Sequence, residues 1–350
     1  MTGAPRIGVV GADVPRQLVL AAGAVPVRIF GSWSGGISPE AAELPGAVDA
    51  VAARILDAVL AGAHDDLAGL IVCNDQVADL RVFYVLRVLA ERGRVPFPVH
   101  LLDAPRGGGA PRERFVARQY ERLVGFVEAA TGRGVDGRGL SDAARRERAL
   151  GAALAELRAR RTSGRCGGVR ALAAYRAAAT LPPEDALAAV DAAIDAPAGA
   201  PVFVTGSSHP DGSVYAAIEA AGLTIVGEDH DAGDAAWLGE AIDTDDLADA
   251  IARLARRHAA RAPLAARSRT RERADELERR LAETRAAGVI ALARDLDDAP
   301  AWDLPEQRRR AERLGVPLES RVRIAPDAAV PTAAEAAAAL ADRIASRSPR

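Results

Sequence analysis

The sequence predicts an α/β protein with two domains, each built on a four-stranded parallel sheet, and a central helical segment between them. Two observations carry this prediction. Short apolar runs alternate with long stretches rich in Ala, Leu and Arg, which is typical of parallel βα units. The same plan of strand, glycine turn, short helix and second strand also appears twice, in "IGVVGADVPRQLVLAAGAVPVRIFG" (7–31) and "VFVTGSSHPDGSVYAAIEAAGLTIVG" (202–227). A single eight-stranded barrel is the competing interpretation, but the central helical stretch would interrupt it.

The expected strands are short apolar runs bounded by Gly, Pro and polar residues. They fall at 6–10, 26–30, 69–73 and 98–102 in the first half, and at 201–205, 223–227, 288–292 and 321–325 in the second. In each half, the third strand leads into a loop with several carboxylates, "CNDQVAD" (73–79) and "RDLDDAPAWD" (294–303). Helices on both faces would bury such sheets.

The stretch from about 113 to 195 predicts helices without strands. Ser141 is a candidate N-cap for the helix over 141–161, and Thr180 caps a helix that opens with two prolines. Thr332 and Glu335 have capping-box spacing for the last helix. We therefore expect a first α/β domain, a helical connecting segment, a second α/β domain and a C-terminal helix, with bounds 1–112, 113–198, 199–330 and 331–350.

Composition excludes several classes of function. The chain has 45 basic and 48 acidic residues and a net charge of −3, so no overall field favours nucleic acid or anionic membranes. Every basic residue is Arg, which excludes Schiff-base chemistry and a P-loop lysine. Two cysteines, Cys73 and Cys166, indicate no disulfide framework, and no apolar run reaches membrane-spanning length. A cytoplasmic protein is expected.

A ligand site is expected outside the carboxyl ends of the strands, where the loops of a parallel sheet converge. If the two domains face one another, one cleft would collect a set of side chains from these loops: Trp33, Cys73, Asp75, Ser207, Ser208, His209, His230, Asp231, Asp297 and Asp298. Helix caps, turn residues and a buried inert thiol at Cys73 are the alternatives. Asp231, Asp297 and His230 are also candidate ligands for a divalent metal.

Four segments, in order, resemble the 2-hydroxyacyl-CoA dehydratase family (D-component), which is related to the B and C subunits of benzoyl-CoA reductase. They are "VPRQLVLAAGAVPVRIFG" (14–31), "DLAGLIVCNDQVADLRVFYVLR" (66–87), "PVFVTGSSHPDGSVYAAIEAAGLTIVGEDHDAG" (201–233) and "AAGVIALARDLDDAPAWDLPEQRRRAERLGVPL" (286–318). The resemblance extends over roughly residues 5–345.

The resemblance implies two flavodoxin-like (Rossmann-like) domains and a heterodimer with a homologous sister subunit. It also implies lyase chemistry: an ATP-dependent iron–sulfur activator injects one electron, and an acyl-CoA thioester loses water through a radical. In such proteins three cysteines hold a [4Fe–4S] cluster in the interdomain cleft. Whether this chain is itself active is left open.

The cluster cysteines do not carry over to this sequence. "ELPGAVDAV" (43–51) contains no cysteine, and Cys73 stands one or two places before the expected second ligand. Asp297 stands at the third cysteine, with Asp298 matching the aspartate that follows it, and Asp231 replaces a further frequent cysteine. We therefore predict a degenerate site without a cluster, in which Cys73 is at best a weak ligand.

Two interpretations of this degenerate site remain. The chain is a partner subunit without iron, or it is a paralogue that binds another ligand or a hard divalent metal in the cleft. The first requires fewer coincidences. For CoA, the candidate contacts are Arg16, Arg81, Gly206 and Ser207, and a solvated surface position is the alternative for both arginines.

Overall fold

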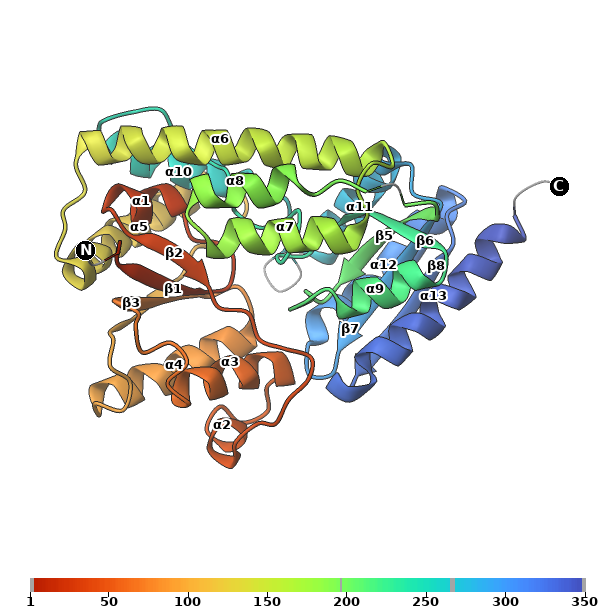
Figure 1. The fold of residues 1–350 in the computed structure, drawn as a ribbon, viewed down its shortest axis with the longest axis horizontal. Helices are drawn as coiled ribbons and strands as arrows, with labels where there is room; N and C mark the ends of the chain where they lie inside the picture. Colours follow the sequence, from red (N-terminus) through yellow and green to blue (C-terminus); the bar gives the residue numbers. More distant parts are fainter. Residues whose placement is uncertain (1–2, 196, 265–267, 348–350) are drawn as a thin grey trace.

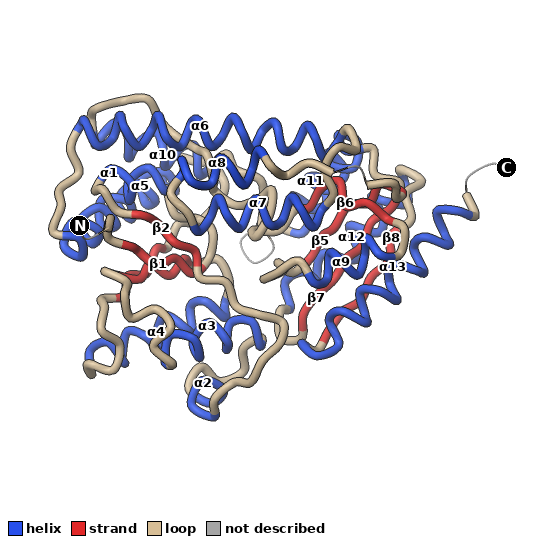
Figure 2. The backbone as a smooth tube through the Cα atoms, in the orientation of Figure 1, coloured by secondary structure: helices blue, strands red, loops and turns tan. Residues whose placement is uncertain are grey.

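The computed structural model describes residues 3–195, 197–264 and 268–347, and it contains two four-stranded sheets in which every strand pair is parallel (Figures 1 and 2). The α/β prediction is therefore confirmed. The first sheet has the order β2-β1-β3-β4, and the second has the order β6-β5-β7-β8. Their strands are β1 (Arg6–Val10), β2 (Val25–Arg28), β3 (Gly69–Cys73), β4 (Val99–Leu102), β5 (Ala200–Gly206), β6 (Leu223–Glu228), β7 (Gly288–Arg294) and β8 (Leu318–Ile324).

Helices cover both faces of each sheet, as continuous apolar strands require. On the first sheet, α1 (Arg16–Ala21) and α5 (Ala110–Thr131) pack on one face, and α3 (Ala50–Leu60) and α4 (Val77–Glu91) on the other. On the second, α9 (Ser213–Ala220) and α13 (Ala329–Ala345) oppose α11 (Thr270–Thr284) and α12 (Asp298–Arg313). A short helix, α2 (Pro39–Glu43), precedes α3.

Long helices connect the two sheets. The helix α6 (Gly137–Thr162) runs past both sheets, contacting α1 at one end and β6 at the other (Figure 1). Beside it lie α7 (Gly168–Thr180) and α8 (Pro183–Asp191). No helix among the described residues is long and apolar enough to cross a membrane.

The chain returns to the first sheet after β6. Trp237 and the buried face of α10 (Leu247–Ala259) belong to the same apolar cluster as Ile7 and Tyr120. The second half of the sequence thus contributes to the core of the first sheet. The predicted domain bounds remain a prediction. This crossing shows that the core of the first sheet contains side chains from both halves of the sequence.

Several local predictions are wrong. The last strand begins at Leu318 instead of 321, and β2 ends at Arg28 instead of 30. Asp136 caps α6 by accepting a hydrogen bond from the Gly139 backbone N–H at 2.7 Å, so Ser141 lies inside the helix. Thr180 ends α7, and Thr332 and Glu335 lie within α13, which a 3-10 turn over Pro326–Ala328 precedes. Asp is as good an N-cap residue as Ser, but the glycines at 137 and 139 made the stretch before Ser141 resemble a loop.

The strand order places a switch point in each sheet. The connections from β1 and β3 leave in opposite directions, as do those from β5 and β7. Loops diverge at such a point and leave a crevice outside the carboxyl ends of the strands. Residues after β1, β3, β5 and β7 are therefore placed to form one cleft between the sheets.

Candidate functional site

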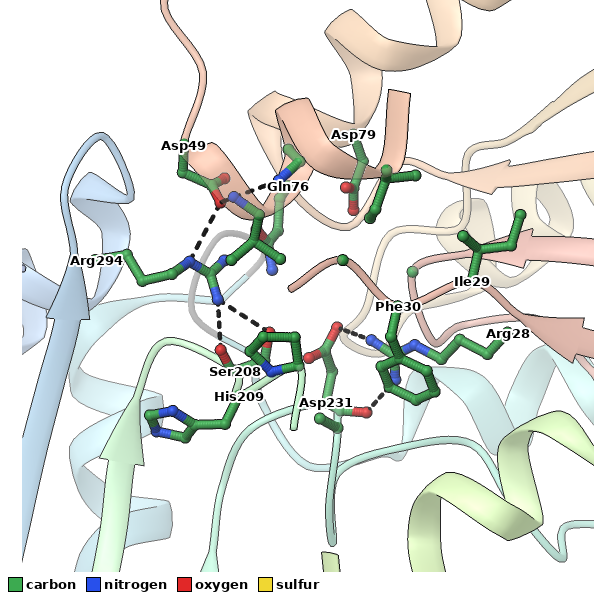
Figure 3. A pocket seen from close by; sticks show the side chains of 17 residues that line it. Arg28, Ile29, Phe30, Asp49, Gln76, Asp79, Ser208, His209, Asp231 and Arg294 are labelled. Atoms are coloured by element: carbon green, nitrogen blue, oxygen red, sulfur yellow. Dashed lines mark hydrogen bonds and ion pairs between the residues drawn. The ribbon is translucent and has the colours of Figure 1, made fainter. Parts of the chain in front are cut away.

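Two small adjoining cavities lie between the carboxyl ends of the two sheets, and Figure 3 shows the side chains that line the first of them. They measure about 40 and 30 Å³ and share Gln76, Ser208 and Asp231 on their walls. The second is lined by Asp75, Gly206, Ser207, Asp229, His230, Leu264, Arg273 and Asp297 besides these three. Since one water needs about 10–15 Å³ of such space, the cavities have room for a few waters.

Two reciprocal ion pairs join the sheets across this cleft (Figure 3). Arg28, the last residue of β2, pairs with Asp231 of the second half at 2.9 Å. Arg294, the last residue of β7, pairs with Asp49 of the first half at 3.3 Å. All four side chains are about nine-tenths buried or more. Each half of the chain thus supplies one guanidinium and one carboxylate to the closure of the cleft.

Asp231 and Asp297 lie on the wall of the same cavity but have opposite electrostatic surroundings. Burial disfavours ionisation of Asp231, but Arg28, His230, Ser208 and Arg294 together outweigh it and lower the pKa of that carboxyl. Burial raises the pKa of Asp297, against the opposing effects of Arg294 and of the Ser207 hydroxyl, which donates to Oδ2 at 2.6 Å. Arg28 therefore fixes one charge in the cleft, whereas Asp297 retains a tendency to hold a proton.

Asp75 and Asp79 are acids on the first-sheet side of the cleft. Asp75 accepts a hydrogen bond from the Ala12 backbone N–H at 2.7 Å. Burial and the neighbouring Asp13 raise the pKa of Asp75 to about 7. Burial also raises the pKa of Asp79 well above its ordinary value, and Asp75 adds to this effect. Both groups can hold a proton near neutral pH, which suits them to proton exchange.

Aromatic side chains form the wall behind the cavities. His209 lies between Trp33 and His230, with ring centroids 5.7 and 5.2 Å away. The Nε2 atom of His230 lies 2.7 Å from the Tyr215 hydroxyl oxygen. Burial lowers the pKa of both histidines, so their rings are neutral at pH 7. Trp33 lines a neighbouring cavity of about 200 Å³.

The structure brings together most of the predicted cleft residues but leaves several out. Cys73 is fully buried in the core of the first sheet, where burial raises the pKa of its thiol well above the ordinary value. Asp298 is exposed in the first turn of α12 and lines neither cavity. A protonated thiol in a packed core is inert as a ligand or nucleophile.

The candidate CoA contacts are scattered. Arg16 is buried and its Nε donates to Glu147 Oε1 at 3.0 Å, so it is not a surface residue. Arg81 is exposed on α4 and donates to the Ala47 carbonyl at 2.9 Å. Gly206 and Ser207 line the second cavity, and a Cβ at Gly206 would lie 2.1 Å from the Leu292 carbonyl oxygen. These four residues do not form one phosphate site.

Sequence reasoning missed Arg28, Arg294, Asp49 and Asp79. Arg294 opens the carboxylate loop over 294–303 and Asp79 closes the loop over 73–79, but other side chains of these loops were predicted to line the cleft. Arg28 is the last residue of β2 and precedes its loop. Asp49 is the N-cap of α3, accepting from the Val51 N–H at 3.1 Å, and Asp79 lies in the first turn of α4. A charged residue at the end of an otherwise apolar strand was the available signal.

The residues in the cleft do not fit a [4Fe–4S] cluster. Such clusters are held mainly by thiolates, and the two thiols lie in different cores, Cys73 in the first sheet and Cys166 among the helices. Asp231 is committed to Arg28, and Asp297 to Ser207. In the described ranges, no three His, Cys, Asp or Glu side chains are arranged to hold a metal ion.

Replacing Asp75 with asparagine is expected to flatten the pH dependence of stability. From about pH 4 to about pH 7 the unfolded chain has lost the Asp75 proton and the folded chain retains it, so the free energy of unfolding falls as the pH rises. Asp75→Asn removes this contribution and should make the fall shallower. Urea unfolding across that range measures it, with Asp298→Asn as the exposed control that should leave the slope unchanged. An equal slope in wild type and Asp75→Asn would contradict the expectation.

Comparison with known proteins places this scaffold in a family. The family model described as "2-hydroxyglutaryl-CoA dehydratase, D-component" matches residues 12–320. No curated protein matches the sequence. The match runs from just after β1 to the first residues of β8, and therefore covers most of the chain. On this basis the chain belongs to the family of the 2-hydroxyglutaryl-CoA dehydratase D-component.

Proposed function

We propose that this chain is a subunit of a 2-hydroxyacyl-CoA dehydratase-type complex that does not itself hold an iron–sulfur cluster. In this proposal a homologous, cysteine-complete sister subunit carries the cluster and forms a heterodimer with this chain. An ATP-dependent iron–sulfur activator supplies the electron, and the substrate is an acyl-CoA thioester. When bound to the sister subunit, the cluster would supply one-electron chemistry.

One observation carries the proposal. The loops in which the resemblance places the family's cysteines hold Asp231 and Asp297, and these acids accept hydrogen bonds from Arg28 and Ser207. Arg28 and Arg294 reach the same region from the ends of opposite sheets. A cleft closed by buried ion pairs offers neither the ligands nor the space that a cubane needs. The scaffold is thus retained for a role other than cluster ligation.

A second candidate function is a non-catalytic paralogue that binds a small ligand in the cleft. Buried polar atoms without a hydrogen-bond partner favour it: Asp231 Oδ1, Asp229 Oδ1 and His230 Nδ1 all belong to residues on the cavity wall. Buried polar groups normally have partners, so these atoms call for a bound group or water. A hard metal held by Asp231, Asp297 and His230 is the variant of this function that the geometry favours least.

The subunit role is tested by reconstitution under anaerobic conditions. The chain is co-expressed with a cysteine-complete family member encoded beside it, and the purified complex is assayed for dehydration of 2-hydroxyacyl-CoA with the activator, ATP and a reductant. We expect a stable heterodimer whose activity requires both chains. In the control, this chain carries the substitution Arg28→Met. The substitution removes the ion pair with Asp231 that closes the cleft, and it leaves the sister subunit unchanged.

Two results would reject the subunit role. One is full activity of the sister subunit without this chain. The other is the absence of a complex between the two chains at micromolar concentration. Either result would favour the ligand-binding paralogue.

A further inference from the structure

We propose that the second cleft cavity binds the ammonium group of a primary amine, with the amine's short apolar chain lying in the first cavity. This inference names a ligand for the same cleft as the proposed function and extends it. The inference depends on the unpaired polar atoms of the cavity wall, on its charge and on the apolar surface next to it.

The unpaired atoms of the wall are mainly acceptors. Asp229 and Asp231 are 7% and 5% exposed, and the Oδ1 atom of each has no partner among the described residues. Their Oδ2 atoms are used, since Thr205 donates to Asp229 at 2.8 Å and Arg28 donates to Asp231 at 2.9 Å. Figure 3 shows the Asp231 carboxylate between Arg28 and Arg294, directed into the cleft. Each carboxylate is thus held through one oxygen and presents the other.

The third unpaired acceptor is His230 Nδ1. The Tyr215 hydroxyl donates to Glu228 Oε2 at 3.1 Å, and Arg161 holds the pKa of Glu228 at about 2 against the effect of burial, so this carboxylate only accepts. With its single hydrogen committed, the Tyr215 oxygen must accept from His230 Nε2 at 2.7 Å. The neutral ring therefore carries its hydrogen on Nε2, and Nδ1 is a bare acceptor.

The three unpaired acceptors, Asp229 Oδ1, Asp231 Oδ1 and His230 Nδ1, match the three N–H donors of an ammonium group in number. An ammonium carries three N–H donors and no acceptor, whereas a hydroxyl or carboxylate ligand would leave acceptors facing acceptors. Among the described residues that line this second cavity, the unpaired donor is Arg273 Nη2, whose guanidinium pairs with Asp303 through Nε at 2.5 Å. In the described residues no three His, Cys, Asp or Glu side chains lie close enough together to hold a metal ion. An ammonium group reaches its acceptors at about 2.7–3.2 Å, farther than the roughly 2.0–2.6 Å of a metal–oxygen bond, so it fits a wider set of acceptors.

Charge on the cavity also favours a cation. Among the described residues, the charged and titratable groups that line it are Asp75, Asp229, Asp231, Asp297, His230 and Arg273, with Arg28 paired to Asp231 and Arg294 paired to Asp297. Burial raises the pKa of Asp75 and Asp297, which shows that ionising the whole set is unfavourable without a further cation. An incoming ammonium would favour the ionised forms, so amine binding is expected to release protons.

The first cavity supplies the place for the alkyl chain. It adjoins the second through Gln76, Ser208 and Asp231. The apolar part of its wall consists of Ile29, Val51 and Ile55, and the rest includes the paired side chains of Arg28, Arg294 and Asp49 and the carboxyl of Asp79. A chain of two to four carbons is what a space of about 40 Å³ allows without opening the cleft.

Titration calorimetry on the purified full chain with n-propylammonium at pH 7 tests the proposal. We expect millimolar or tighter binding, with proton release revealed by two buffers of different ionisation enthalpy. 1-Propanol, which lacks the charge, and tetramethylammonium, which lacks N–H donors, should bind at least about tenfold more weakly. Asp229→Asn should weaken propylammonium binding about tenfold or more, whereas Asp298→Asn, outside the cavity, should not.

Three outcomes would overturn the proposal: no propylammonium binding up to ~100 mM, equal binding of tetramethylammonium, or binding of Mn²⁺ in place of the amine. If Asp229→Asn does not fold, as judged by circular dichroism, Asp297→Asn takes its place with the same expectation. The experiment needs neither a sister subunit nor an electron donor. A failure here would therefore leave the subunit role intact, and a failure of the reconstitution would leave the amine site intact.

Discussion

Replacing Asp13 with asparagine is expected to lower the free energy of unfolding by about 3–5 kcal/mol. Asp13 follows β1 and is almost fully buried. Its Oδ1 accepts from Arg106 and Arg261 at 2.5 Å each. Burial alone would raise the pKa of Asp13, but the two guanidiniums outweigh it and hold the pKa well below its ordinary value. The asparagine keeps the shape but leaves two buried cations with no counter-charge between them.

The same carboxylate joins both halves of the chain. Arg106 follows β4 in the first sheet, whereas Arg261 follows α10 in the second half of the sequence. Chemical denaturation, followed by circular dichroism, measures the loss. The matched control is Asp66→Asn, because Asp66 pairs with Arg6 at the surface and such pairs contribute about 0–1 kcal/mol. Equal effects of the two substitutions would show that the buried network does not stabilise the fold.

Replacing Arg28 with methionine is expected to cost a similar amount, about 3–5 kcal/mol, because Asp231 would remain buried without its partner. The methionine retains apolar bulk, so the loss reports on charge. Replacing both residues, as Arg28→Met with Asp231→Leu, should restore much of the stability, since no uncompensated charge remains in the cleft. We therefore expect the Arg28–Asp231 ion pair to add little stability compared with an apolar pair at the same positions. Its main effect would be to determine how the two sheets pair across the cleft.

A double-mutant cycle measures this coupling directly. Arg28→Met, Asp231→Leu and the double variant are compared by denaturant unfolding, and we expect a coupling energy of several kcal/mol. The exposed pair Arg94 and Glu40 provides the control cycle, with a coupling of about 1 kcal/mol or less. Additive losses at Arg28 and Asp231 would contradict the interdomain pairing.

Most of the fold could be predicted because the central strands of both sheets, β1, β3, β5 and β7, are buried over most of their length. Strands such as 6–10, 69–73 and 223–227 are apolar runs flanked by glycines and polar turns. Few structures other than buried parallel strands fit this pattern. The return of the chain to the first sheet at α10 could not be predicted. An amphipathic helix shows that one face is buried, but it does not show against which of two sheets.

The cleft could be predicted in part. The rule that ligands lie at strand ends brought together Asp75, Ser207, His230, Asp231 and Asp297, all of which line the second cavity. It could not identify the partners of these acids. The two arginines that close the cleft come from opposite sheets, so their role depends on how the sheets face each other, and a sequence pattern within one half does not encode that.

We infer that buried charge pairs close this cleft and that the chain holds no iron–sulfur cluster there. The most direct test measures iron and acid-labile sulfide in the chain purified alone under strict anaerobic conditions, after incubation with iron, sulfide and a reductant. The account predicts far less than one iron per chain and no broad visible absorption. Iron and sulfide at about four each per chain, lost in Cys73→Ala, would contradict it.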